Sequence, residues 1–299
     1  MGIRLATATI KAIDDAIKAD QGAAFRGYLR SLLPQFEDIY RTEDDGPRSH
    51  LGASVIGKEC AREVWFGHRW YARESHPGRI VRLFNRGHME EPRFLAALMC
   101  AGVTPYFVDE SGNQFKFKNL DGHFAGSLDS VLVGLPELGT EPALGEFKTH
   151  GEKSFVQLQK YGLRESKITH YVQMQIYMQE FNLRFGLYLA VNKNTDELYG
   201  EIIEFDEVTA ARYTDRARGV LGSTRPPRGI SQSPSWYGCK MCSFSKVCHT
   251  KTPAAKSCRS CTHVLLTPHG GWACNLRGGA ALSKEEQIRA CENYAEIEK

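Results

Sequence analysis

The chain alternates between two kinds of hydrophobic pattern. Apolar residues three or four positions apart, as in Ala12 to Ile17, predict amphipathic helices. Ser54 is a capping residue that can start a helix. Pro92 predicts a kink or a break in the helix that contains it. The predicted helices cover residues 7–40, 54–65, about 80–99, 170–181 and about 207–221.

Between and after these helices, apolar residues recur at every second position, which is typical of strands. The pattern alternates from 106 to 133, with Gly112-Asn113 as a hairpin signal. The predicted strands include 126–133, 144–149, 183–192 and 198–205, and the polar residues 41–53 indicate a loop. This order of elements predicts an α/β (α+β) fold with a central mixed sheet flanked by helices.

Three charged residues stand inside two of these apolar strands. Asp129 lies in the first, and Glu146 and Lys148 lie in the second. Side chains alternate along a strand, so Glu146 and Lys148 face the same side. If the two strands are neighbours, two carboxylates and an amine converge. Carboxylate oxygens are the ligands that Mg²⁺ and Mn²⁺ prefer, and such a site can hydrolyse a phosphodiester.

Bulk composition narrows the class of protein. The 299 residues are 42% hydrophobic and 24% charged, with a net charge of +3, which is ordinary for a globular chain and only a weak sign of an anionic partner. No apolar run is long enough for a transmembrane helix, and the N-terminus has no signal-peptide core. These features predict a cytoplasmic protein without membrane partners.

Two further motifs flank the charged residues at suitable distances. Gly87-x-x-x-Glu91 precedes them, and Gln173-x-x-x-Tyr177 follows on one face of a predicted helix. From Gly87 to Tyr177 the chain resembles the PD-(D/E)xK nuclease superfamily, in its RecB-like and lambda-exonuclease-like branch. The residue before Asp129 is Leu128 rather than the proline of the motif's name. The resemblance implies a restriction-endonuclease-like core.

The resemblance also implies a role for each matching residue. Asp129 and Glu146 bind the divalent metal, and Glu91 binds a metal directly or through water. Lys148 orients or activates the attacking water and stabilises charge on the phosphate. Gln173 and Tyr177 shape the site and contact the DNA backbone. His88 is either a further metal ligand, as in many RecB-like members, or a packed or surface histidine.

Basic residues surround the proposed site in the sequence. Arg86 precedes it, and Lys153, Lys160 and Arg164 follow it. Their positions predict contacts to DNA phosphates, although charged residues also form ordinary solvated faces. Phe155, Tyr161 and Tyr171 are candidates for stacking on unpaired bases, with core packing as the equal alternative.

Nine cysteines are distributed unevenly, with seven between Cys239 and Cys291, which favours metal ligation in a reducing compartment. The compact run Cys239-x₂-Cys242-x₅-Cys248 supplies three sulfurs, and Cys60 is the candidate for the fourth. This arrangement resembles the iron–sulfur nucleases, among them the CRISPR-adaptation exonucleases and the AddB-type subunits. The resemblance implies a structural [4Fe–4S] cluster, and a zinc site with the same sulfurs is the alternative.

A second set of cysteines follows the first. Cys258-x₂-Cys261, Cys274 and Cys291 suit a Cys₄ zinc knob, with His263 and His269 as possible substitutes for one sulfur. We therefore expect residues 1–250 to form a nuclease domain closed by the cluster, and residues 251–299 to form a small zinc-binding module.

The predicted function is a divalent-metal-dependent DNA exonuclease. The resemblance implies a role in recombination, repair or phage replication, in a bacterial or phage-infected host cell. Its expected partners are DNA and a single-strand annealing or recombination protein. A structure-specific or restriction-like endonuclease is the alternative within the enzymes. A non-catalytic nucleic-acid-binding protein with structural metal sites is the alternative outside them.

Overall fold

The computed structural model describes residues 2–42, 46–73 and 75–299. The chain divides into two compact units. The first contains Met1–Asp44, His76–Phe117 and Ser127–Ala210, and the second contains Asp45–Ser75, Lys118–Gly126 and Ala211–Lys299. The predicted loop at 41–53 includes residues 43–45, which lie outside the described residues. The predicted boundary near residue 250 stays a prediction.

The first unit is built on a five-stranded sheet with the order β2-β5-β6-β7-β8. Its strands are β2 (Thr104–Tyr106), β5 (Ser130–Val133), β6 (Ala143–His150), β7 (Phe185–Asn192) and β8 (Leu198–Glu204). β6 and β7 run parallel, and every other pair is antiparallel. The predicted α/β class with a central mixed sheet is therefore confirmed.

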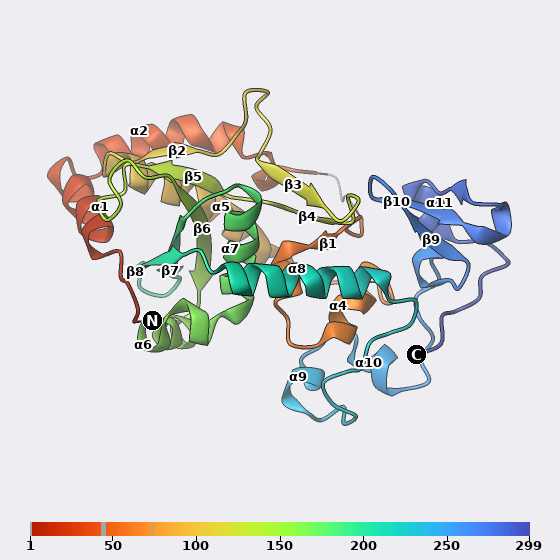
Figure 1. The fold of residues 1–299 in the computed structure, drawn as a ribbon. Coiled ribbons are helices and arrows are strands. Elements are labelled where there is room, and N and C mark those ends of the chain that lie inside the picture. The colour runs from red at the N-terminus through yellow and green to blue at the C-terminus, as the bar shows by residue number, and fades with distance from the viewer. Residues whose placement is uncertain (1, 43–45, 74) are drawn as a thin grey trace. The chain divides into compact units, whose positions relative to one another are not determined.

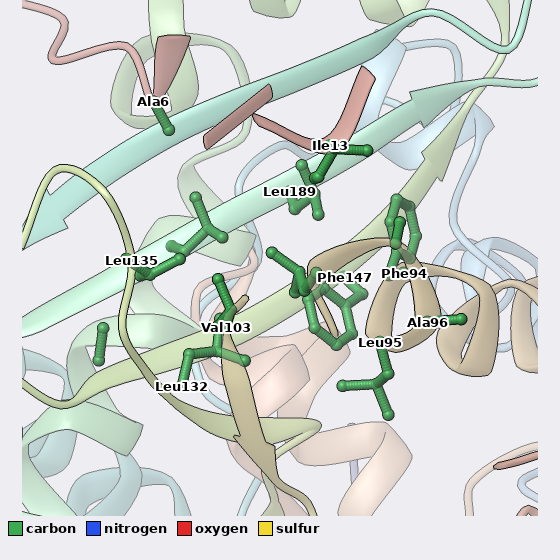
Figure 2. Close-up of a cluster of buried hydrophobic side chains, with 14 of the residues drawn as sticks. Ala6, Ile13, Phe94, Leu95, Ala96, Val103, Leu132, Leu135, Phe147 and Leu189 are labelled. Carbon is green, nitrogen blue, oxygen red and sulfur yellow. The ribbon is translucent and has the colours of Figure 1, made fainter. Parts of the chain in front are cut away.

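Helices cover both faces of this sheet (Figure 1). On one face, α1 (Thr7–Ala19), α2 (Ala23–Leu32) and α5 (Gly78–Cys100) bury the main apolar core. Phe94 of α5 stacks on Phe147 of β6 with ring centroids 5.2 Å apart. Figure 2 shows this core, in which Ile13 and Leu189 lie near the same ring pair. Odd-numbered residues of β6 and β7 thus point into the core.

The opposite face carries α6 (Glu152–Ser166) and α7 (Ile168–Glu180). Contact is close here, because a Cβ added at Gly186 of β7 would lie 2.7 Å from Met174 Cε of α7. Even-numbered residues of β6, including Glu146 and Lys148, therefore point toward α6 and α7. The sequence pattern did not predict α6, which is amphipathic around the buried Phe155 and Leu158.

Several predicted elements differ from the structure. Pro92 lies inside the unbroken helix α5, where burial of Phe94, Leu95 and Leu98 offsets the lost hydrogen bond. The strand predicted at 126–133 is two strands, β4 (Phe124–Ser127) and β5, because the chain turns at Leu128 and Asp129. Likewise, the helix predicted at 54–65 is two short helices, α3 (Ala53–Ile56) and α4 (Ala61–His68), with Cys60 as the N-cap of α4.

The second unit holds the smaller elements. One sheet has the order β1-β4-β3, with β1 (Leu51–Gly52), β4 and β3 (Lys116–Asn119). The other has the order β11-β10-β9, with β9 (Val264–Thr267), β10 (Gly271–Cys274) and β11 (Ala280–Ala281). The helix α8 (Glu207–Gly222) begins in the first unit and ends in the second, and α9 (Tyr237–Lys240), α10 (Ser245–His249) and α11 (Lys284–Arg289) follow it. Short 3₁₀ turns cover Leu33–Gln35, Glu37–Ile39, Cys258–Ser260 and Asn275–Arg277.

A buried guanidinium organises part of the second unit. Arg259, only 1% exposed, lies between two indole rings, with its Cζ 3.8 Å from the Trp70 centroid and 4.3 Å from the Trp272 centroid. Its Nε donates to Gln287 Oε1 at 2.8 Å. Cation–π contacts of this kind are strongest where water is excluded. The stack therefore joins the turn at Cys258–Ser260 to the residues that follow α4.

Among the described residues, none of the helices has both the length and the apolar character needed to cross a lipid bilayer.

Candidate active site

Asp129 and Glu146 lie side by side at the junction of β5 and β6. Ser130 pairs with Gly145 in the antiparallel ladder, so the next residue on each strand brings Asp129 beside Glu146. The backbone N–H of Phe147 donates to Asp129 Oδ2 at 2.9 Å, which fixes that carboxylate. Because β5 and β6 are direct neighbours, the convergence predicted from the sequence is present.

Lys148 and Gln173 hold the second carboxylate from both sides. Lys148 Nζ donates to Glu146 Oε1, and it also donates to Phe147 O at 3.1 Å. Gln173 Nε2, on α7, donates to Glu146 Oε2 at 3.2 Å. Glu146 is 0% exposed, so its carboxylate depends on these two partners.

The charges of this cluster shift one another's pKa values. Burial, followed by the negative charge of Glu146, raises the pKa of Asp129 well above its ordinary value. Burial also raises the pKa of Glu146, and the neighbouring Lys148 opposes that rise. The two carboxylates raise the pKa of the Lys148 ammonium against the effect of burial. Repulsion between buried carboxylates is what a bound divalent cation relieves.

Glu91 of α5 belongs to the same electrostatic cluster, because its charge raises the pKa of Asp129, Glu146 and Lys148. His88 lies one turn before it, with Nδ1 3.8 Å from Glu91 Oε1. This contact is the main cause of a raised His88 pKa. His88 therefore faces Glu91, as a metal-binding histidine of this helix would. The two roles predicted for His88, a metal ligand and a packed or surface histidine, stay predictions.

Gln173 and Tyr177 are both buried on α7. They are 6% and 3% exposed, respectively. Gln173 Nε2 lies 3.4 Å from Tyr177 OH, and the Tyr177 ring meets the edge of Phe117. Burial leaves these two side chains little surface for the predicted contact to the DNA backbone, which stays a prediction, and the hydrogen bond from Gln173 to Glu146 agrees with a role of Gln173 in shaping the site.

The sequence pattern missed a buried bridge beside the carboxylates. Tyr188 OH lies 2.8 Å from His150 Nε2 and 2.9 Å from His170 Nδ1, and His150 Nδ1 lies 3.0 Å from Ser154 Oγ. Tyr188 pairs with Glu146 across β6 and β7. The bridge joins two strands and two helices whose residues are far apart in sequence.

The predicted DNA-binding residues remain on the surface. Arg86, Lys153, Lys160 and Arg164 are exposed. A kink at Gly162 (φ +71°, ψ 175°) separates Arg164 from the two lysines, and Arg164 pairs with Asp206 at 3.7 Å. Phe155 is 0% exposed and packs on Tyr199, so it cannot stack on a base, unlike the exposed Tyr161.

The carboxylate oxygens of the cluster are the type of ligand that a divalent cation takes. In the described part of the chain, no group of three or more His, Cys, Asp or Glu side chains stands in a finished metal-binding arrangement. Here Glu146 turns both oxygens to Lys148 and Gln173. The buried, mutually repelling carboxylates nevertheless match the oxygen ligands that Mg²⁺ and Mn²⁺ take. A cation would be held by Asp129 and Glu146, with Glu91 and His88 beside them.

The first cysteine set surrounds one cavity in the second unit. Cys60, Cys239, Cys242 and Cys248 all line it, together with Arg62, Glu63, Phe66 and Phe244. Arg62 Nη1 lies 3.7 Å from Cys248 Sγ, which is a suitable contact for a thiolate. Burial raises the pKa of Cys242 to about 11. A metal would therefore have to displace its proton.

The second cysteine set lines another cavity in the same unit. Cys258, Cys261, Cys274 and Cys291 surround it with His263. Burial, followed by the charges of the other three sulfurs, raises the pKa of Cys258 to about 11. The N–H of Ala295 points at Cys261 Sγ at 3.5 Å, a contact that supports thiolate ligands. His269 does not line the cavity. Among the described residues neither cysteine set is drawn together into a metal-binding group, so both metal assignments stay predictions.

Comparisons with solved structures give distant likenesses. No family model matches the chain, and no curated protein matches it. An alkaline exonuclease, LHK-Exo from Laribacter hongkongensis, aligns at 13% identity and a TM-score of 0.41, covering 58% of this chain and 87% of that one. Its complex with dAMP gives the same identity and TM-score, covering 86% of that chain. A protein named SSO0001 aligns at 17% identity and a TM-score of 0.38, covering 77% of this chain and 99% of that one. At these identities and TM-scores the likenesses assign no activity to this chain.

Proposed function

We propose that this chain is a divalent-metal-dependent DNA nuclease that hydrolyses phosphodiester bonds as an exonuclease. The observation that carries the proposal is the pairing of Asp129 with Glu146 across β5 and β6, with the Lys148 amine on the same side. A non-catalytic binding groove gains nothing from buried carboxylates, because they repel phosphate. Exonuclease rather than endonuclease activity is inferred from the family resemblance of the sequence motifs.

The residues divide the chemistry between them. When bound at Asp129 and Glu146, Mg²⁺ or Mn²⁺ would supply positive charge to the phosphate and acidify water. Lys148 has a raised pKa and stays protonated at neutral pH, so it orients water and stabilises negative charge rather than removing a proton. Gln173 keeps Glu146 in place by the hydrogen bond to Oε2. Glu91 and His88 would complete the metal environment from α5.

The cysteine sets are proposed as structural metal sites. Cys60, Cys239, Cys242 and Cys248 would hold a [4Fe–4S] cluster, and Cys258, Cys261, Cys274 and Cys291 would hold Zn²⁺. Shared cavities in the second unit support both assignments. Two zinc sites remain the alternative. The proposed setting is DNA recombination, repair or phage replication, with an annealing or recombination protein as partner.

Cleavage assays with two substrates test the proposal. Purified protein with Mn²⁺ is expected to degrade end-labelled linear DNA and to leave covalently closed circles intact. Opening of circles would identify an endonuclease. Tight binding without any cleavage in Mn²⁺ or Mg²⁺ would support the non-catalytic alternative, provided that the metal content of the preparation is measured in parallel.

A further inference from the structure

Three basic side chains, from three different parts of the chain, lie near the ends of β6 and β7. They are Arg86, Lys193 and Lys167. Arg86 lies on α5, and its Nη2 donates to the carbonyl oxygen of Lys193 at 3.1 Å. Lys193 directly follows β7, and its own N–H donates to His150 O at 2.8 Å. Lys148 lies two residues before His150 on β6. Backbone hydrogen bonds therefore hold Arg86 and Lys193 beside the strand that carries the catalytic lysine.

Lys167, at the start of α7, also lies near the end of β6. It precedes that helix, and its carbonyl accepts from the N–H of His170 at 2.9 Å. His170 is joined to His150 by the hydroxyl of Tyr188, at 2.9 and 2.8 Å. The bridge thus places Lys167 near the end of β6. The charges of Lys148, Lys167 and Lys193 act together on His150, where with burial they lower its pKa to about 4.

Within the described ranges, no carboxylate forms an ion pair with Arg86, Lys167 or Lys193. Lys167 and Lys193 are both partly buried, which disfavours their charged forms. The two bridging histidines are neutral at physiological pH and add no negative charge. Like charges held together in this way are stabilised by an anion between them.

We propose that Arg86, Lys167 and Lys193 form a binding site for a backbone phosphate of the DNA strand, adjacent to the phosphate that is cut. The inference rests on the proposed nuclease function, because it takes the cluster at Asp129 and Glu146 as the place of cleavage. A nucleic-acid strand suits the site because its phosphates recur at short, regular intervals. Tyr188 acts as a positioning residue, since it holds the strand and helix ends that carry two of the cations.

Binding measurements on an inactive protein test this site. In an Asp129→Asn background, Lys193→Gln is expected to weaken binding of a single-stranded oligonucleotide severalfold. It should also lower the slope of log affinity against log salt by about 0.7, the value for one lost phosphate contact. Lys193→Arg should retain both properties. Lys18→Gln, an exposed lysine on α1, is the matched control and should change neither.

A neutral methylphosphonate, moved one linkage at a time along the oligonucleotide, locates the contact. At one linkage it should weaken binding to the Asp129→Asn protein but cause no further loss with Lys193→Gln. Additive losses at every linkage would overturn the site, as would equal salt slopes for Lys193→Gln and Lys18→Gln. Displacement of DNA by an acidic peptide, with the same dependence on Lys193, would assign the site to a protein segment instead.

The failure of this inference can be told from failure of the proposed function. If the unmodified chain cleaves DNA but Lys193→Gln binds normally, only the phosphate site is wrong. If the unmodified chain cleaves no DNA in Mn²⁺, the nuclease proposal fails, whatever Lys193 does.

Discussion

The backbone N–H of Phe147 donates to Asp129 Oδ2 at 2.9 Å, so the residue between Glu146 and Lys148 also positions the other carboxylate. Phe147 itself points to the opposite face, where it stacks on Phe94. The side chain of Phe147 thus anchors β6 in the core, and its backbone N–H holds the Asp129 carboxylate beside Glu146. This relationship explains why the site requires direct pairing of β5 with β6.

Asp129→Asn should abolish cleavage without unfolding the protein. The amide oxygen can still accept from Phe147 N–H, but the residue loses the negative charge that a divalent cation needs. We expect cleavage in Mn²⁺ to fall by more than about a hundredfold. Circular dichroism and urea denaturation should remain close to those of the unmodified chain.

Asp215→Asn, an exposed acid paired with Arg218 on α8, serves as control and should leave cleavage unchanged. Retained activity in Asp129→Asn would contradict the assigned metal site.

Gln173 and Gln175 offer a matched pair of buried glutamines on α7. Gln173 supports Glu146, whereas Gln175 accepts from Asp206 N at 2.7 Å and donates to Glu204 O at 3.1 Å. Gln173→Ala should weaken Mn²⁺ binding and cleavage about 10- to 100-fold, as loss of a supporting contact does. Gln175→Ala should instead lower the free energy of unfolding by about 1–3 kcal/mol. Calorimetric Mn²⁺ titration of both variants separates the two effects, and equal Mn²⁺ affinities would refute the role of Gln173.

The sequence predicted the residues whose roles follow from local spacing. Glu146 and Lys148 share a face because a strand alternates, and Gln173 and Tyr177 share one because a helix repeats. Their burial was not predictable, because it depends on how α7 packs on β6. The Tyr188 bridge escaped prediction for a similar reason, since it joins His150 and His170 only after the parallel pairing of β6 and β7. The break at Asp129 was missed because Leu128 continues the apolar pattern.

Two single substitutions should distinguish the cysteine sets by metal content. Cys60→Ser should remove iron and visible absorbance and leave zinc unchanged, whereas Cys258→Ser should remove zinc and keep the colour. Cys100→Ser, at the end of α5 and outside both cavities, should change neither. Elemental analysis with absorbance spectroscopy checks all three variants. Colourless protein that carries two zinc ions would replace the cluster by a second zinc site.

Arg259 should be essential to the stability of the second unit. Its guanidinium is buried between Trp70 and Trp272, and lysine cannot reproduce the planar stack. Arg259→Ala should lower the free energy of unfolding by about 2–4 kcal/mol, and Arg259→Lys should recover only part of this. Urea denaturation monitored by tryptophan fluorescence reports on it directly. Arg277→Ala, which removes an exposed contact to Glu286, is the control and should leave the free energy of unfolding nearly unchanged. Similar losses for both would contradict the importance of the stack.

The two histidines bridged by Tyr188 should make folding sensitive to mild acid. Burial and nearby lysines lower the pKa of His150 to about 4 and of His170 to about 3, below the ordinary value of about 6.5. In the unfolded chain both rings take up protons as the pH falls below about 6.5, whereas in the folded chain they stay neutral. Stability therefore decreases between about pH 6.5 and 4, by up to about 1.4 kcal/mol per pH unit for each histidine.

His170→Asn removes one of these titrating groups, so its urea midpoint should fall less steeply between pH 7 and 5 than that of the unmodified chain. His76→Asn, at an exposed position outside both cysteine cavities, is the control and should keep the steep dependence. Parallel pH profiles for the unmodified chain and His170→Asn would show that the bridge is not held in its neutral form.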